Sequence, residues 1–197
     1  MTEPAKPEPA KPEPALAAPS PWVLRFLAAA PAEGGRLLDL AASKGRHTKL
    51  ARARGWRVTA VDRETGALAA LAAEDDGIAA LTMDLEAGDA GATVRALGAA
   101  GPFGIVIVCN YLHRPLLPHL PALLKPGGRL IYETFMIGNE AWGRPRNPDF
   151  LLRHGELPSV FEGRLTTLAF EQGFDAHPSP RVVQRYAGLS GESAGTV

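Results

Sequence analysis

The sequence predicts an α/β fold with a doubly wound, mostly parallel sheet and a C-terminal antiparallel hairpin. Three observations predict it. Short apolar runs alternate with helical segments between residues 36 and 135, which is typical of parallel strands joined by crossover helices. The run 105–109 is apolar throughout, as in a strand that is buried on both faces. Beyond residue 163, two strand-like runs follow each other without a helix between them, which predicts antiparallel pairing.

The predicted elements follow in order along the chain. A short helix from Trp22 to Ala30 begins after Ser20-Pro21, an N-cap followed by proline at the first helical position. The predicted strands are 36–40, 56–61, 78–83, 105–109, 129–135, 164–172 and 181–187. The predicted helices between the strands are 48–54, 64–73, 90–99 and 116–124. The segment 136–163 is predicted to be loop-like, with a short helix around Asp149 to Leu152.

Both ends of the chain are predicted to lie outside the folded domain. Residues 1–19 contain a five-residue repeat of proline with alternating charge, which opposes helix and sheet and favours a disordered, extended tail. A tether for a partner is the alternative interpretation of this repeat. Residues 20–188 are expected to form one domain, and residues 189–197 a flexible C-terminal tail.

Composition argues against several functional classes. Lys plus Arg number 21 and Asp plus Glu number 21, so the chain has no basic excess for nucleic acid or anionic lipid. The single cysteine, Cys109, makes neither an internal disulfide nor a cysteine metal cluster, which is typical of a reducing compartment. No apolar run is long enough for a signal peptide or a membrane span. We therefore expect a cytoplasmic protein with a small-molecule substrate and no nucleic-acid, membrane or metal partner; the oligomeric state is left open.

Three predicted strands end in an aspartate: Asp39, Asp62 and Asp84. Each alone is as well explained as a helix N-cap, but ligands of open α/β sheets bind outside the carboxyl ends of the strands, where these three carboxylates meet. The first turn, D-L-A-A-S-K-G over residues 39–45, contains small residues and leads into a helix N-terminus, which lets the backbone approach a ligand closely.

The placement of these acids favours an aminoacyl-sulfonium cofactor over NAD. Asp39 lies directly beneath the first turn, where a carboxylate would repel a pyrophosphate but suits an ammonium or a sulfonium. Asp62 follows about twenty residues later, where an acid accepts hydrogen bonds from ribose hydroxyls. Asp84-Leu85 is placed to meet adenine, with the carboxylate on the amino group and the leucine over the ring.

Six stretches of the chain carry a family resemblance: L-L-D-L-A-A-S-K-G-R-H-T, V-T-A-V-D-R, M-D-L-E, N-Y-L-H-R-P-L-L-P, K-P-G-G-R-L-I-Y-E-T-F and G-N-E-A-W-G-R-P-R-N-P-D-F-L-L. From Pro19 to about Ala187, the chain resembles the small bacterial class I methyltransferases related to the tellurite-resistance methyltransferases. This resemblance implies the class I methyltransferase Rossmann-like fold and S-adenosylmethionine as methyl donor.

The expected cofactor-binding residues lie in the first turn and at the strand ends. They are Asp39, Ala41, Ser43, Gly45, Arg46, His47, Asp62, Arg63, Asp84, Leu85 and Asn110. The resemblance implies a methionine-binding loop at residues 39–45, the ribose acid at Asp62 and a cofactor-facing Asn110. For Arg46 and His47, contact with the cofactor carboxylate competes with helix capping or a surface position.

Ser43 departs from the family, which usually has glycine at this position. A Cβ in left-handed geometry costs about 1–2 kcal/mol, or about one power of ten in affinity. Lys44 adds a cation that lies near the sulfonium or pairs with the cofactor carboxylate or Asp39. A non-catalytic, degenerate S-adenosylmethionine-binding protein is therefore one alternative. An NAD-dependent oxidoreductase is a second, disfavoured by Asp39, by the missing second glycine and by the terminal hairpin.

Tyr111, His113 and Arg114 are the expected catalytic residues, because they follow the fourth predicted strand beside the cofactor-facing Asn110. With Arg144, they supply hydrogen-bond donors and positive charge, and arginine holds an oxyanion in a two-pronged geometry. We expect a methyltransferase whose acceptor is small and anionic or soft, such as a thiol or a metalloid oxyanion. A structural role for the lone histidine and solvated loop positions for the arginines are the alternatives.

Overall fold

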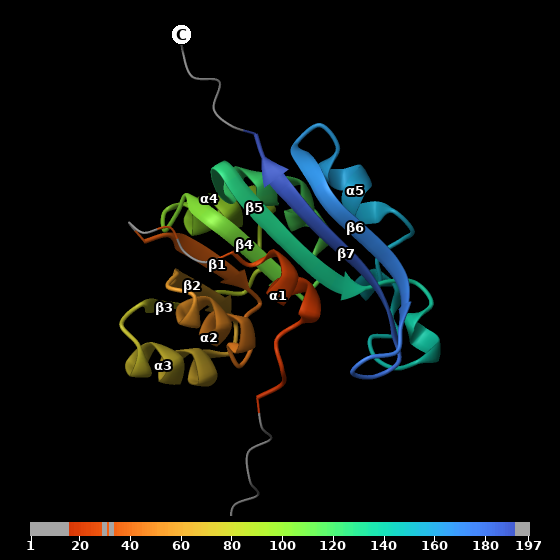
Figure 1. Ribbon diagram of the computed structural model, residues 1–197, viewed down its shortest axis with the longest axis horizontal. Coiled ribbons are helices and arrows are strands. Elements are labelled where there is room, and N and C mark those ends of the chain that lie inside the picture. Colours follow the sequence, from red (N-terminus) through yellow and green to blue (C-terminus); the bar gives the residue numbers. More distant parts are fainter. Residues whose placement is uncertain (1–15, 29–30, 32–33, 192–197) are drawn as a thin grey trace, which may run out of the picture.

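The computed structural model describes residues 16–28, 31 and 34–191 of the 197-residue chain. In this part of the chain, one sheet has the strand order β3-β2-β1-β4-β5-β7-β6 (Figure 1). Its strands are β1 (Arg36–Leu40), β2 (Arg57–Asp62), β3 (Ile78–Thr82), β4 (Phe103–Cys109), β5 (Leu124–Phe135), β6 (Leu165–Asp175) and β7 (Arg181–Ser190). Strands β1 to β5 are parallel, whereas β7 pairs antiparallel with β5 and β6 antiparallel with β7. The predicted fold class is confirmed, including the terminal hairpin.

Helices connect the parallel strands, as predicted. The α-helices are α1 (Pro21–Phe26), α2 (Arg46–Ala53), α3 (Thr65–Glu74), α4 (Ala90–Gly98) and α5 (Glu156–Phe161), and the 3-10 helices are η1 (Arg114–Leu123), η2 (Asn139–Ala141) and η3 (Pro148–Phe150). The predicted N-cap of α1 is confirmed, because the Ser20 hydroxyl accepts hydrogen bonds from the N–H groups of Trp22 (3.1 Å) and Val23 (3.5 Å). Helix α1 ends at Phe26, four residues earlier than predicted, and Ala29 and Ala30 lie outside the described residues.

Two predictions about local structure are wrong. The helix predicted over 116–124 is the 3-10 helix η1, because prolines at 115, 118 and 121 lack the N–H groups of an α-helical ladder and recur with the three-residue period of a 3-10 helix. The short helix predicted around Asp149 to Leu152 is present as η3, but the segment 136–163 is more ordered than predicted, because it also contains η2 and α5. Leu157 and Phe161 of α5 are buried, and their four-residue spacing marks one face of a helix.

The two predicted tails fall largely outside the described residues, which exclude residues 1–15 and 192–197. The predictions of a disordered N-terminal extension and a flexible C-terminus therefore stay predictions. One boundary is corrected, because β7 continues to Ser190 and includes two residues that were assigned to the tail. Among the described residues, every helix is too short or too polar to cross a membrane.

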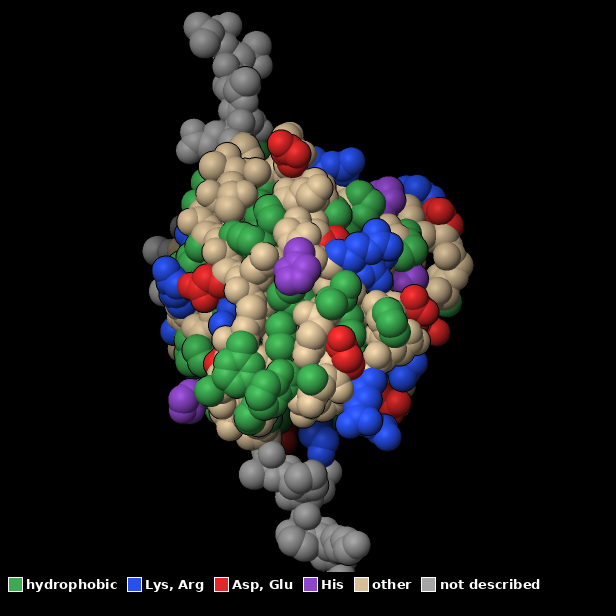
Figure 2. All heavy atoms as spheres, turned by 90° about the vertical axis from the view of Figure 1, so that its right-hand side faces the viewer, with side chains coloured by type: hydrophobic (Ala, Val, Ile, Leu, Met, Phe, Trp, Pro, Cys, Tyr) green, Lys and Arg blue, Asp and Glu red, His purple; other side chains and the backbone are tan. Residues whose placement is uncertain are grey.

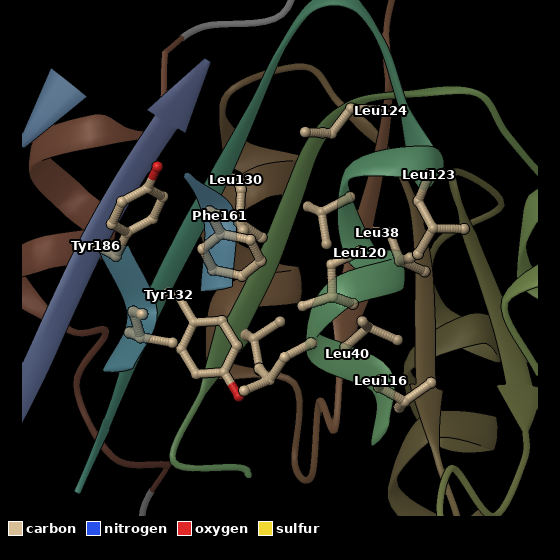
Figure 3. Close-up of a cluster of buried hydrophobic side chains, with 14 of the residues drawn as sticks. Leu38, Leu40, Leu116, Leu120, Leu123, Leu124, Leu130, Tyr132, Phe161 and Tyr186 are labelled. Carbon is tan, nitrogen blue, oxygen red and sulfur yellow. The ribbon is translucent and has the colours of Figure 1, made fainter. Parts of the chain in front are cut away.

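Apolar side chains bury both faces of the central strands β1, β4 and β5, as the run in β4 predicts. Successive residues of a strand point to opposite faces. Ile105 and Ile107 therefore pack with α1, α2 and α3, whereas Val106 and Val108 pack with α4, η1 and α5. Figure 3 shows the second of these layers, in which leucines of η1 lie against Leu38 and Leu40 of β1 and the rings of Tyr132 and Phe161 close the far side. The strands are thereby fixed between two layers of helices.

Buried charges join the hairpin to the parallel strands. Glu133 of β5 is fully buried and accepts a hydrogen bond from Arg185 of β7 at 2.6 Å. Arg181 of the same strand lies 3.5 Å from the Glu133 carboxylate. Both arginines also contact Asp175 of β6, at 3.1 Å for Arg181. With Glu171 of β6, which lies 3.8 Å from Arg185, this ion network spans β5, β7 and β6.

The strand order reverses between β1 and β4, since β1 pairs with β2 on one side and with β4 on the other. The loops that follow β1, β2, β3 and β4 leave the sheet at the same edge because these strands are parallel. This edge is the position where open α/β sheets bind their ligands. Asp39, Asp62 and Asp84 lie at or just after the strand ends here, as predicted.

Candidate functional site

The turn between β1 and α2 has three residues in the left-handed region. The φ angles are 54° at Ala41, 51° at Ser43 and 76° at Gly45. The left-handed geometry predicted for Ser43 is confirmed. At Gly45, a Cβ would lie 2.1 Å from Cδ1 of Leu71, so glycine is required there for packing as well as for backbone geometry. The turn thus keeps the α2 N-terminus close to the strand edge.

Asp62 holds this turn in place. Its Oδ2 accepts a hydrogen bond from the Ser43 N–H at 2.8 Å, and its Oδ1 accepts one from the Glu64 N–H at 3.0 Å. The Ala42 N–H donates to the carbonyl of Val61 at 3.0 Å, so backbone and side chain both join the turn to the end of β2. The carboxylate keeps further lone pairs for a ligand, and the ribose role of Asp62 stays a prediction.

Replacing Ser43 with glycine is expected to stabilise the fold. Relief of left-handed strain contributes about 1–2 kcal/mol, offset by about 0.5–1 kcal/mol of added chain entropy in the unfolded state. The net gain is about 0–1.5 kcal/mol, which urea unfolding of Ser43→Gly measures. Because the folded turn already has this geometry, affinity for S-adenosylhomocysteine should change less than twofold. A large gain in affinity without a gain in stability would mean that the turn changes conformation on binding.

A cleft of about 300 Å³ lies beside this turn, and its acidic side chains come from the two loops that follow β2 and β3. We call it the acidic cleft; its lining residues are Ala41, Ser43, Asp62, Arg63, Glu64, Met83, Asp84, Leu85, Glu86, Asn110 and Tyr111. Asp84 accepts a hydrogen bond from the N–H of Glu86 at 2.9 Å, and Leu85 is buried beneath the cleft. The structure therefore brings together the residues predicted for ribose and adenine, and adds Met83 and Glu86, which were not assigned. Both belong to the M-D-L-E stretch that follows β3.

A second cavity, of about 410 Å³, adjoins the acidic cleft. We call it the basic cavity; it is lined by Leu16, Ala17, Ala41, Ala42, Ser43, Lys44, Arg46, His47, Cys109 and Asn110. The two share Ala41, Ser43 and Asn110 and so form one bent groove across the strand switch. Acidic groups line one arm of this groove and cationic groups the other.

Arg46 and His47 also hold the segment before α1 over the basic cavity. Arg46 donates to the carbonyl of Ala18 at 3.3 Å, and Nε2 of His47 accepts a hydrogen bond from the N–H of Ser20 at 3.1 Å. Burial and, secondarily, the Arg46 charge lower the pKa of His47 to about 3, so its imidazole is neutral. Helix capping or a surface position was the alternative interpretation of these two residues; the structure instead shows contacts with the segment before α1, alongside their place in the cavity wall.

Cys109 lies at the floor of the basic cavity. A guanidinium nitrogen of Arg46 lies 3.3 Å from its sulfur, and its thiol donates to Glu133 at 3.8 Å. Burial, and then the charge of Glu133, raise the pKa of this thiol to about 12. The thiol therefore stays protonated at neutral pH and is a poor nucleophile, because the thiolate is the reactive form.

Asp39 lies beneath the turn, as predicted, but is not part of the wall of either arm. It is buried, and its Oδ2 accepts a hydrogen bond of 2.7 Å from the Thr48 hydroxyl. Burial raises its pKa to about 6, against the opposing effects of the Thr48 hydrogen bonds and the Arg46 charge. Most molecules therefore carry a negative charge here at pH 7. Direct contact of Asp39 with a cofactor stays a prediction.

A third cavity, of about 330 Å³, adjoins the acidic cleft at the ends of β4 and β5. We call it the aromatic cavity; it is lined by Arg63, Glu86, Asn110, Tyr111, Leu112, Thr134, Phe135, Pro145 and Phe150. Phe135, Pro145 and Phe150 were not predicted as site residues. Pro145 lies in a part of the segment 136–163 that was predicted as loop, and Phe150 lies in the short helix that was predicted there without a role.

The three predicted catalytic residues do not line one common cavity. Tyr111 lines both the acidic cleft and the aromatic cavity. His113 lines none of the three cavities and precedes η1. Arg114 also lines none of them, and its catalytic role stays a prediction. Its guanidinium forms a two-pronged ion pair with Glu156 at 2.7 and 3.1 Å. It also donates to two carbonyls of the segment 136–163, each at 2.7 Å, so its donors are engaged in joining η1 to that segment.

The segment 136–163 and the hairpin form one face of the molecule, on which apolar side chains gather (Figure 2). Trp142 and Phe174 are more than half exposed and pack together, with ring centroids 4.8 Å apart. Trp142 therefore packs on the hairpin rather than covering the groove. Trp22 of α1 is buried and donates to the carbonyl of Tyr186 at 3.2 Å.

Solved structures of methyltransferases share this architecture. TehB from Haemophilus influenzae aligns with a TM-score of 0.62 and 14% identity, over 81% of this chain and 58% of TehB. The N-methyltransferase NodS from Bradyrhizobium japonicum aligns with a TM-score of 0.61 and 16% identity, over 87% of this chain and 91% of NodS. The chain has the class I methyltransferase fold. This confirms the predicted fold and the likeness to the tellurite-resistance group at the level of structure.

A third methyltransferase structure contains ligands. The 1,6-didemethyltoxoflavin-N1-methyltransferase of Burkholderia thailandensis, solved with its substrate and S-adenosylhomocysteine, aligns with a TM-score of 0.60 and 17% identity, over 87% of this chain and 75% of that enzyme. No family model and no curated protein matches the chain. The methyltransferase fold is thus shared with proteins of very different sequence, and function must be argued from the groove.

Proposed function

We propose that the chain is an S-adenosylmethionine-dependent methyltransferase that binds its cofactor along the bent groove. The observation that carries the proposal is the division of charge between the two arms, which meet at Ala41, Ser43 and Asn110. Acidic side chains in one arm suit the hydroxyl and amino donors of adenosine, and cationic side chains in the other suit the amino-acid carboxylate. Asp39 beneath the turn adds negative charge near the ammonium and sulfonium.

Each arm has named residues for the cofactor. Asp62 and Asp84 would accept hydrogen bonds from the ribose and the adenine amino group, and Leu85 would pack against the ring. Lys44 and Arg46 would bind the carboxylate. A NAD pyrophosphate would instead meet the buried charge of Asp39, so the groove suits S-adenosylmethionine better. The solved relatives that contain S-adenosylhomocysteine support this assignment.

Methyl transfer from S-adenosylmethionine requires little chemistry from the protein's own side chains. S-adenosylmethionine, when bound, supplies an electrophilic methyl group for in-line displacement by the acceptor. The residues of the groove orient the two reactants and exclude water, which is the main contribution of a protein to such a transfer. The thiol of Cys109 stays protonated and Nε2 of His47 already accepts a hydrogen bond from the Ser20 N–H, so neither side chain is prepared to act as a nucleophile.

We propose that the acceptor is a small molecule in the aromatic cavity, whose 330 Å³ suit a compound of modest size. The sequence suggested an anionic acceptor that is bound by Arg114 and Arg144. The guanidinium of Arg114 is already paired with Glu156, which leaves Arg144. Arg63 in the cavity wall is accompanied by Glu86, so this wall carries no net charge. Phe135 and Phe150 favour an acceptor with an apolar or planar surface, and the exposed Arg144 is left as the candidate for binding an anionic group.

S-adenosylhomocysteine is expected to stabilise the protein, whereas NAD is not. At a concentration of 100 times the dissociation constant, a ligand of the native state adds about 2.7 kcal/mol, or roughly 5–10 °C in melting temperature for a domain of this size. Asp62→Ala should weaken binding by about 1–3 kcal/mol. Asp62→Asn keeps an acceptor for the Ser43 N–H and is the matched control for damage to the turn. Equal melting shifts with NAD, or none with S-adenosylhomocysteine, would refute the proposed cofactor.

Methyl transfer is tested separately, with radiolabelled S-adenosylmethionine and a panel of small thiols, heteroaromatic amines and oxyanions. Transfer to a panel member supports the proposed enzyme. Tight binding of S-adenosylhomocysteine with no transfer to the panel, to RNA or to protein would favour a non-catalytic cofactor-binding protein. Transfer to RNA or protein alone would refute the small-molecule acceptor while leaving the enzyme class intact.

A further inference from the structure

The hydroxyl of Tyr111 is a buried polar group in an otherwise well-paired site. Its oxygen is screened from solvent and has no hydrogen-bond partner among the residues that the structure describes. Other polar side chains around the groove are paired, such as Asp39 with Thr48 and Asp62 with two N–H groups. A buried donor that lacks a partner costs about 1–3 kcal/mol, so its presence needs an explanation.

The backbone holds Tyr111 in this position. The carbonyl of Tyr111 accepts a hydrogen bond of 2.8 Å from the hydroxyl of Tyr132, which is itself buried in the core. The preceding residue, Asn110, has a φ of 56°, and its N–H donates to the carbonyl of Glu133 at 2.8 Å. Hydrogen bonds therefore fix the backbone both before and after the Cα atom of Tyr111. Figure 3 shows Tyr132 within the leucine layer that anchors this contact.

The surroundings of the hydroxyl identify the kind of group it would meet. Tyr111 lines the acidic cleft, and the charged groups that act on it are Glu86, Asp84, Arg63 and Asp62, all from that cleft. Burial, followed by the charges of Glu86 and Asp84, raises its pKa, so the hydroxyl remains a donor. Carboxylates of the cleft only accept hydrogen bonds from a ligand. Adenosine also has acceptor atoms, in the purine ring and the ribose, and these need a donor.

We propose that the Tyr111 hydroxyl donates a hydrogen bond to an acceptor atom of the adenosine part of the cofactor. Tyr111 is then a cofactor-binding residue, in place of the acceptor-side role that its position in the sequence suggests. The proposal rests on the proposed function, because it takes the acidic cleft to be the adenosine site. It also explains the unpaired hydroxyl, whose partner is a ligand atom and not a protein atom.

The test compares Tyr111→Phe with the wild-type chain by calorimetric titration of S-adenosylhomocysteine and of 5′-methylthioadenosine, which lacks the amino-acid part. Loss of the hydrogen bond is expected to weaken both ligands by the same factor, about five- to tenfold. Because the variant removes an unpaired buried group, the melting temperature of the free protein should be unchanged or higher. Tyr186→Phe is the matched control: its hydroxyl lies 3.2 Å from that of Thr167, away from the groove, and its loss should leave both affinities unchanged.

Each contrary result has a distinct meaning. If Tyr111→Phe leaves both affinities unchanged while the wild type binds both ligands, the assignment of Tyr111 is overturned and the proposed function stands. If only S-adenosylhomocysteine weakens, the hydroxyl meets the amino-acid part and the proposal is wrong in its partner. A fall in the melting temperature of the free variant would assign Tyr111 a structural role. If the wild type binds neither ligand, the proposed function fails together with the inference.

Discussion

Asp39→Asn is expected to stabilise the protein above pH 6 while weakening its binding of S-adenosylhomocysteine. The folded state raises the pKa of Asp39 from 3.8 to about 6, chiefly by burial. Between these two values the folded state binds more protons than the unfolded state, so stability falls as pH rises through this window. Above pH 6 the full penalty is present, at roughly 3 kcal/mol for a shift of about two units. Asparagine removes this charge and keeps an acceptor for the Thr48 hydroxyl.

Urea unfolding of both proteins at pH 4, 5, 6 and 8 measures this effect. The stability of the variant should exceed that of the wild type by an amount that grows from pH 4 to pH 6 and then stays constant. Thr48→Val is a useful comparison, because it removes the hydrogen bond of 2.7 Å and should raise the pKa of Asp39 further. A constant stability difference across the four pH values would mean that Asp39 is not the group that titrates. Unchanged ligand affinity would mean that its charge does not act on the cofactor.

Glu133→Gln is expected to destabilise the protein by about 3–5 kcal/mol, the usual cost of removing one partner from a buried ion pair. Glu133 has no exposed side-chain surface and neutralises Arg185 and Arg181, which are themselves only 16% and 12% exposed. The substitution leaves both cations with the partly exposed Asp175, and Arg185 also with Glu171 at 3.8 Å, as acidic partners. Because Glu133 joins β5 to the hairpin, local opening should begin there.

Chemical unfolding gives the size of this loss, and amide hydrogen exchange of β6 and β7 gives its location. Glu171→Gln is the comparison: the same substitution on β6, at a side chain that is 48% exposed, pairs with Arg25 at 2.9 Å and reaches the network only at its edge, 3.8 Å from Arg185. Surface ion pairs contribute less than about 1 kcal/mol. Equal losses in the two variants would show that burial of the Glu133 network is not what makes it stabilising.

Local sequence patterns were sufficient to predict those features of the fold that depend on neighbouring residues alone. Apolar runs ending in aspartate located β1, β2 and β3 to within two residues and brought Asp39, Asp62 and Asp84 to one edge. The Ser43 position was recognised as left-handed because the expected residue was glycine. The second left-handed residue, Ala41, was placed in the cofactor loop with no statement of its geometry, because alanine is not a usual residue for this conformation.

Long-range partners account for what the sequence did not predict. Arg114 was assigned to an acceptor because arginine binds oxyanions, but its partner Glu156 lies 42 residues later, on a helix that was predicted to be loop. The aromatic cavity was not predicted for the same reason, because Pro145 and Phe150 reach the strand edge only after the segment 136–163 folds back. The buried charges of β5 and β7 likewise meet only across the finished sheet.

The ion pair between Arg114 and Glu156 has a consequence for how this protein can diversify. The wall of the aromatic cavity comes partly from residues 136–163, whereas the bent groove is built from the loops after β1 to β4. Arg114 lies at the start of η1, just after the loop that follows β4. Its guanidinium contacts Glu156 and the carbonyls of Asp149 and Leu151, and so joins the segment 136–163 to this loop. Substitutions at Pro145 or Phe150 therefore change the shape of the aromatic cavity but not the lining of the bent groove. Laboratory evolution of new acceptor preferences should draw its mutations from this segment and leave Arg114 and Glu156 unchanged.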